Sequence, residues 1–356
     1  MARVSGKAKF GGQLGRAAGV EYTEVPRSMP ESMVVEPASL PAQLGPYRII
    51  RSIGSGGMAQ VLLGRRFGAS GWEKDVAIKI LRAEHRGRVE LERFLLTEAR
   101  LGARFAHPNL IAVHDLGLAD GVYYLCMDYV DGRDLAALLT RAPLPRALAL
   151  LIGEQLAAAL AYVHDLRDDA GRPLGLVHRD VSPGNVLLSR AGAVKLGDFG
   201  IAKATATDDR TWGRLHVGKF AYMAPEQLMG EALSGETDVF ALGVTLHECL
   251  LGRRPFDREG SGGVGASLQA IRGAELAADH DFGDLAPGLA ACLRSCLERE
   301  PKRRPDAAAL SRVLQSARRS LPPVSTVDLA QWVCGCLDEG ESGTRVVMET
   351  LGMDES

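Results

Sequence analysis

The chain has 356 residues, with 42 Lys and Arg against 44 Asp and Glu, which gives a formal net charge of −2. This length permits one large core or two lobes, and the near-balance of charge gives no support for a general nucleic-acid-binding or membrane-surface protein. The six cysteines lie scattered in apolar stretches, unlike the short regular spacings of a secreted disulfide scaffold, so a cytoplasmic location is favoured.

The first 46 residues mix Gly, Ser and Pro without a sustained period, which predicts a flexible N-terminal extension over 1–46. Basic residues near its start are followed by no continuous apolar run, so no secretory signal is expected. The most apolar long stretch, residues 147–166, is interrupted by Glu154 and Gln155. It therefore predicts a buried core helix and no membrane segment.

From Tyr47 onward, short segments rich in β-branched residues predict antiparallel strands: "YRIIRSIG", "AQVLLGRR" and "DVAIKIL". Beyond Asp134 we expect helices over 147–165, 237–251, 288–299 and 306–320. The predicted class is therefore α+β, with a strand-rich lobe that includes one helix (about 47–126), a hinge (127–131) and a larger helical lobe (132–320). Residues 321–356 would form a tail with a short helix from about Val327 to Leu337.

A glycine-rich turn, "IGSGGMAQV" from Ile53 to Val61, lies between two predicted strands. Gly54, Gly56 and Gly57 would let the backbone bend closely over a phosphate chain and present N–H groups to it. Taken alone the segment is weakly specific, because glycine-rich hairpins are common turns. The third glycine of the pattern GxGxxGxV is here Ala59.

Lys79 lies in the middle of an apolar predicted strand, where a buried ammonium group needs an acidic partner. Between Val89 and Phe105 the apolar residues recur at helical spacing, and Glu98 falls on the same face. The sequence therefore predicts an ion pair between Lys79 and Glu98.

Further motifs follow in order: HRDVSPGN from His178, DFG from Asp198, APE from Ala224, Asp238 at the start of a helix, and Arg304 before a proline. With the glycine-rich turn, Lys79 and Glu98, this series over about residues 47–320 resembles the bacterial eukaryotic-like serine/threonine protein kinases of the protein kinase superfamily. The resemblance implies a bilobal protein kinase fold, transfer of the γ-phosphate of ATP to protein hydroxyls, autophosphorylation and a signalling role.

The resemblance also implies roles for individual residues. Lys79, held by Glu98, would bind the ATP phosphates, and Asp180 would orient the substrate hydroxyl and accept its proton. Asn185 and Asp198 would hold Mg²⁺, or Mn²⁺ in its place. Met127 would be the gatekeeper beside adenine, and Asp134 would reach the ribose. The other residues implied for ATP binding are Ile53, Gly54, Ser55, Gly56, Gly57, Met58, Ala59, Gln60, Val61, Ala77, Asp128 and Val130.

Arg179, directly before Asp180, implies control by phosphorylation of the activation segment, because a phosphate there would supply a counter-charge. The candidate sites are Thr205, Thr207 and Thr211. For each of these threonines, a simple role as a polar loop residue is an equal alternative. Asp238 and the Glu226–Arg304 pair are interpreted as buried scaffold charges.

The sequence departs from the family pattern at two positions. Ser182 stands where related kinases carry a lysine, and Lys219 stands where they carry a threonine, in "GKFAYMAPE". Our hypothesis is that the two groups have exchanged places, so that Lys219 supplies the ammonium near Asp180 and Ser182 supplies the hydroxyl. The alternative is that Lys219 is a solvated loop charge and that catalysis is slow.

The leading interpretation is an active kinase acting on Ser or Thr of protein substrates, with no nucleic-acid partner and with a transient dimer for trans-autophosphorylation. The alternative is a pseudokinase, an ATP-binding or scaffolding module. Against it stand Lys79, Glu98, Asp180, Asn185 and Asp198, all of which are present. A small-molecule kinase is a third reading, which the APE segment disfavours.

Overall fold

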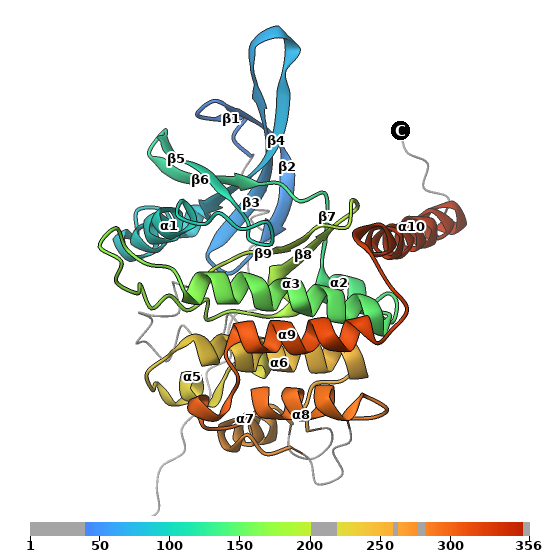
Figure 1. Cartoon of the computed structure of the whole chain (residues 1–356). Helices are drawn as coiled ribbons and strands as arrows, with labels where there is room; N and C mark the ends of the chain where they lie inside the picture. The colour runs from blue at the N-terminus through green and yellow to red at the C-terminus, as the bar shows by residue number, and fades with distance from the viewer. Residues whose placement is uncertain (1–39, 201–218, 259–262, 277–281, 352–356) are drawn as a thin grey trace, which may run out of the picture. The chain divides into compact units, whose positions relative to one another are not determined.

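The computed structural model describes residues 40–200, 219–258, 263–276 and 282–351; the side chains of Lys219, Val264 and residues 339–351 lie outside this description. The described residues form an antiparallel sheet of strand order β1-β2-β3-β4-β6-β5, a small sheet of order β7-β8-β9, and a group of helices (Figure 1). The first sheet comprises β1 (Gln43–Leu44), β2 (Tyr47–Ser55), β3 (Ala59–Phe67), β4 (Glu73–Leu81), β5 (Val113–Ala119) and β6 (Val122–Asp128). Because β1 pairs with β2, ordered structure begins before the predicted boundary at Tyr47.

Side chains along β4 point alternately to the two faces of the sheet. Val76, Ile78 and Ile80 are buried in a cluster on one face of the sheet, so Ala77 and Lys79 project to the other face. Helix α1 (Val89–Gly102) packs its Leu95 and Ala99 against Leu125 of β6, which is the direct cross-strand partner of Lys79. The sequence thus places the helix that carries Glu98 over the face that carries Lys79.

The helical lobe is built around α3 (Arg146–His164), which packs on α6 (Gly235–Leu251) and α9 (Ala307–Arg319). Among the described residues, α3 is the one helix whose length and composition would suffice to cross a membrane, yet 61% of its apolar window is buried in the protein. Its Glu154 accepts hydrogen bonds from Arg318 and Gln315 of α9. The polar interruption in this apolar sequence therefore marks contact with another helix of the core.

Of the remaining elements, only α8 was predicted. These elements are α2 (Leu135–Leu139), α5 (Pro225–Met229), α7 (Gly263–Gly273), α8 (Pro287–Cys296), β7 (Gly132–Asp134), β8 (Val186–Ser189) and β9 (Val194–Leu196). Short 3-10 turns cover Ala69–Gly71, Ala83–His85, Pro183–Asn185, Lys219–Tyr222 and Pro301–Arg303. The C-terminal ends of the four predicted helices differ from the observed ones by zero to three residues: α6 ends at Leu251 as predicted, and the largest difference is at α8, which ends at Cys296.

The C-terminal helix is longer than predicted: α10 runs over Thr326–Leu351, so the expected end at Leu337 is wrong. The prediction followed the apolar stripe Leu329, Val333, Cys336 and Leu337, which is buried in the core of the helical lobe. Beyond that stripe no proline interrupts the chain, and the helix continues through its own backbone hydrogen bonds. Helix α10 lies beside α2 and β8 (Figure 1).

The packing of α10 against the helical lobe should contribute to the free energy of unfolding. Leu329 is fully buried, so Leu329→Ala should lower the free energy of unfolding by about 2–4 kcal/mol. Gln331→Ala, an exposed position on the same helix, should change it by less than about 0.5 kcal/mol. Urea unfolding followed by circular dichroism measures both; equal effects would contradict the observed packing of α10.

Candidate active site

Lys79 joins three elements through one ammonium group. Its Nζ donates to Glu98 Oε1 at 2.8 Å and Oε2 at 3.0 Å, and to Asp198 Oδ1 at 2.8 Å. Glu98 lies on α1, and Asp198 follows β9 of the other lobe. The side chains of Lys79 and Glu98 are 14% and 17% exposed, whereas that of Asp198 is 51% exposed. The predicted Lys79–Glu98 pair is present, and it opens toward solvent on the side of Asp198.

The surroundings of Lys79 keep it charged. Burial by itself would lower the pKa of its ammonium, but the carboxylates of Asp198 and Glu98 outweigh burial and raise the pKa above the usual range of lysine. A fixed positive charge that is shielded from water is well suited to hold a phosphate group. Because one ammonium group faces two carboxylates, the cluster is formally negative, so a phosphate group would bind here together with a cation.

The loop from His178 to Asn185 is held by Asp238 at the start of α6. Its carboxylate accepts from the backbone N–H of His178 at 2.7 Å and of Arg179 at 2.8 Å, and from His164 Nε2 at 2.9 Å. Asp238 is only 1% exposed. Since one buried carboxylate fixes two consecutive peptide groups, the position of the next residue, Asp180, is set by the core of the helical lobe.

Two residues of this region adopt left-handed backbone conformations without being glycine: Arg179 at φ 69° and Asp198 at φ 55°. Such conformations cost free energy and persist only where the surroundings enforce them. At Arg179 the restraints are Asp238 on its N–H and Gln227 Nε2 on its carbonyl oxygen, at 3.0 Å. Strain at the two motif positions indicates selection for the placement of their side chains.

Asn185 and Ser182 are buried beside Asp180. Asn185 Nδ2 donates to the backbone oxygen of Asp180 at 2.6 Å, which ties the amide to the catalytic loop. Ser182 is 2% exposed, and its Oγ has no hydrogen-bond partner among the described residues. A hydroxyl in this state is costly to bury, so Ser182 has a hydrogen-bonding capacity that the described part of the fold does not use.

The aromatic ring of Phe199 packs between those of Phe105 and His178. The ring of Phe199 lies 4.6 Å from that of Phe105 and 4.3 Å from that of His178, measured between centroids. Burial lowers the pKa of His178, so its ring is neutral. Gly200 then approaches so closely that an added Cβ would lie 3.1 Å from Asp180 Cβ, which explains the glycine of DFG.

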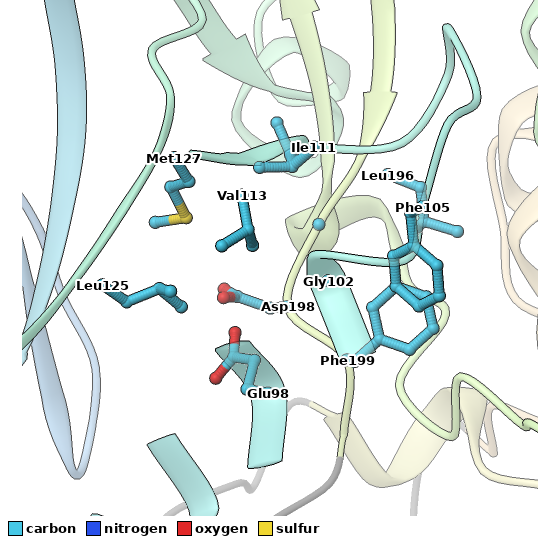
Figure 2. A pocket seen from close by; sticks show the side chains of 11 residues that line it. Glu98, Gly102, Phe105, Ile111, Val113, Leu125, Met127, Leu196, Asp198 and Phe199 are labelled. Carbon is cyan, nitrogen blue, oxygen red and sulfur yellow. The ribbon is translucent and has the colours of Figure 1, made fainter. Parts of the chain in front are cut away.

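A small cavity lies beside Glu98 and Asp198, and Figure 2 shows its lining, with the carboxyl groups of these two residues facing one another. Met127, Val113 and Leu125 cover its apolar side, and the rings of Phe105 and Phe199 lie at the opposite end (Figure 2). The predicted gatekeeper Met127 is thus one of the residues that line this cavity.

The residues predicted to bind adenine lie on β4, on β6 and just beyond it. Ala77 and Met127 are direct cross-strand partners, as are Val76 and Asp128. The Asp128 carboxylate is engaged by His114 Nε2 at 2.8 Å and Lys195 Nζ at 3.1 Å. Burial would raise the pKa of Asp128, but the hydrogen bonds from Lys195 and from the backbone N–H of Ala112 lower it. Its carboxylate is therefore occupied by protein groups, and its backbone N–H donates to Ala112 O at 2.9 Å.

Lys195 and His114 were not predicted. Lys195 lies in the apolar segment "VKL" three residues before Asp198, so the reasoning applied to Lys79 would have found it.

Asp134 accepts a hydrogen bond from Ala137 N at 2.8 Å and thereby caps α2. Val130, which follows β6, is half-buried.

The structure describes the predicted pair of Glu226 and Arg304 but not the predicted phosphorylation sites. Arg304 Nη1 and Nη2 bind Glu226 at 2.6 and 2.9 Å, with both side chains buried, so the expected scaffold pair is present. Thr205, Thr207, Thr211 and the side chain of Lys219 lie outside the described residues.

The glycine-rich turn connects β2 to β3, with Ser55 opposite Gln60 and Gly54 opposite Val61. The tip is exposed, and it closes through a hydrogen bond from Gly56 N to Ala59 O at 2.8 Å. Met58, Ala59, Gln60 and Val61 are half-buried, as is Ile53. All of the residues predicted for this turn are therefore on one continuous hairpin above the face that carries Lys79.

A two-lobed arrangement with this set of residues at the junction defines the class of protein kinases. The family model "Protein kinase domain" matches residues 47–314. The chain therefore belongs to the protein kinase domain family.

Curated relatives include the tyrosine-protein kinase MasK of Myxococcus xanthus, 39% identical over 281 residues, which covers 76% of this chain and 43% of the relative. The serine/threonine-protein kinase PrkC of Bacillus subtilis is 38% identical over 216 residues, covering 60% of this chain and 32% of PrkC. This chain thus spans less than half the length of these relatives. The crystal structure of the Mycobacterium tuberculosis PknI kinase domain is similar with a TM-score of 0.56 and 29% identity, covering 78% of this chain and all of that one.

Proposed function

We propose that the chain transfers the γ-phosphate of Mg-ATP to Ser or Thr hydroxyls of protein substrates, including its own. The observation that carries the proposal is the position of Lys79, which holds Glu98 and Asp198 together next to the loop of Asp180 and Asn185. A degenerate scaffold would have no need to keep this buried cluster of charges, which is costly to desolvate.

The glycine-rich turn fits a phosphate chain. A Cβ added to Gly54 would lie 3.8 Å from Val61 Cβ, and one added to Gly56 would lie 3.7 Å from Ala59 O, which are ordinary contacts. Neither glycine has a positive φ. Because the folded chain does not itself require glycine at these positions, the missing side chains are best explained by the close approach of a ligand.

The site also fits a magnesium ion. Asp198 and Asn185 offer carboxylate and amide oxygens, the ligand types that this cation prefers. When bound, Mg²⁺ would neutralise charge on the phosphate oxygens. Lys79 would hold the phosphates, and Asp180 would orient the acceptor hydroxyl and take its proton.

Serine and threonine are proposed as acceptors because relatives such as PrkC are described as serine/threonine-protein kinases. MasK, at 39% identity, is described as a tyrosine-protein kinase, so tyrosine is the second candidate. We place the reaction in the cytoplasm because all six cysteines are free thiols, and we propose a transient dimer for phosphorylation in trans.

The test of the proposed function is incubation of the purified chain with γ-labelled Mg-ATP, followed by phosphoamino-acid analysis. We expect label on Ser and Thr, and a rate at least about a hundredfold lower for Asp180→Asn, which loses the acceptor for the hydroxyl proton. Equal label in both proteins, or none in either, would favour the scaffold. Label on tyrosine alone would favour the second candidate.

We further propose that Lys219 and Ser182 have exchanged roles. Lys219 would supply the ammonium group that related kinases have at position 182, and Ser182 would supply the hydroxyl group that they have at position 219. Ser182 Oγ, buried without a partner among the described residues, supports the idea that this hydroxyl serves the reaction. Loss of one charge aimed at a transition state commonly costs about 3 kcal/mol, so Lys219→Thr should slow autophosphorylation by about a hundredfold.

A double-mutant cycle tests the exchange. Ser182→Lys combined with Lys219→Thr rebuilds the usual arrangement, so the double variant should be faster than the product of the two single effects. If its rate equals that product, the two residues act independently and the exchange hypothesis is wrong.

A further inference from the structure

The glycine-rich turn is attached to the segment between β4 and α1. His85 Nε2 contacts Gly57 O at 3.1 Å, and Arg82 Nη1 donates to Gly56 O at 3.4 Å. The backbone N–H of Arg82 donates to Met58 O at 3.0 Å. Three consecutive carbonyl groups of the turn are thus bound by residues that lie 24 to 28 positions later in the sequence.

These contacts leave the other side of the peptide groups available. Among the described residues, no acceptor is bound by the N–H groups of Gly57 and Met58. Because each carbonyl points into the segment Ala83–His85 or to Arg82, the adjoining N–H groups keep a fixed direction. Fixed backbone N–H groups in a tight turn form an anion-binding concavity.

The state of His85 supports a specific role. A carbonyl oxygen only accepts, so Nε2 must carry the proton in the contact with Gly57. Its Nδ1 is buried and has no partner among the described residues. Burial of an unsatisfied ring nitrogen opposes stability, so stability alone does not explain a histidine here; the contact with the turn does.

We propose that His85, assisted by Arg82, is a positioning residue that holds the glycine-rich turn in the conformation that receives the phosphates of ATP. The proposal rests on the proposed function, because it assumes that the turn covers ATP. It extends the site to the segment between β4 and α1, which contains none of the predicted ATP-binding or metal-binding residues. Arg82 is the weaker half of the attachment, since it is also paired with Glu84 at 2.8 Å.

The first experiment needs no nucleotide. Amide hydrogen exchange should become faster at Gly56 and Arg82 in His85→Ala, because both N–H groups donate within the attached turn. His85→Gln retains a donor at the same reach and should exchange as the wild type does. Arg86→Ala, an exposed neighbour in the same segment, is the matched control and should also leave exchange unchanged.

The second experiment compares ATP with adenosine by calorimetry. His85→Ala should raise the Kd for ATP about five- to tenfold, the effect of one lost hydrogen bond, and leave the Kd for adenosine unchanged, because only ATP reaches the turn with phosphates. His85→Gln should restore ATP affinity. Unchanged exchange and ATP affinity in His85→Ala, or equal weakening of both ligands, would overturn the proposal. If the wild type binds no ATP, the proposed function fails, while the exchange comparison still decides whether His85 holds the turn.

Discussion

A buried ammonium group needs counter-charges, and the site is organised around the way in which Lys79 obtains them. Glu98 comes from α1 and Asp198 from the end of β9, so one side chain links the sheet, its helix and the other lobe. Removal of Lys79 would leave the buried Glu98 carboxylate without its cation in a poorly solvated place. The same requirement that orders the three elements therefore leaves one ammonium group between two carboxylates, and the exposed one, Asp198, faces the side proposed for a metal-bound phosphate chain.

A second set of buried charged residues, all of them hydrogen-bonded, holds the backbone around the site. Asp238 holds the peptide groups of His178 and Arg179, and Arg304 holds Glu226 while also donating to three backbone oxygens. These groups are too deeply buried to react with a substrate. They hold the loop from His178 to Asn185 and the APE segment against the helical core. The positions of Asp180 and Asn185 relative to Asp198 are fixed in this way.

Much of this arrangement follows from the sequence. The position of Lys79 within an apolar strand and the helical spacing around Glu98 were sufficient to predict that the two residues meet, and the change from strand-rich to helical segments predicted the two lobes. The attachment of the turn by His85 was missed, because a contact between side chain and backbone across a loop leaves no periodic signal. The length of α10 was missed for a related reason: its apolar stripe ends at Leu337, whereas the helix continues without one.

The central claim is that Lys79, Asp198 and Asn185 form a site for ATP bound to a divalent cation. Calorimetric titration of ATP with Mg²⁺ and with EDTA tests it most directly, using the wild type, Asp198→Asn and the exposed control Asp169→Asn. The account predicts that Mg²⁺ lowers the Kd for ATP by about tenfold or more in the wild type and in Asp169→Asn, and that this gain is lost in Asp198→Asn. Equal affinity of the wild type with and without Mg²⁺, or a full Mg²⁺ effect in Asp198→Asn, would contradict it.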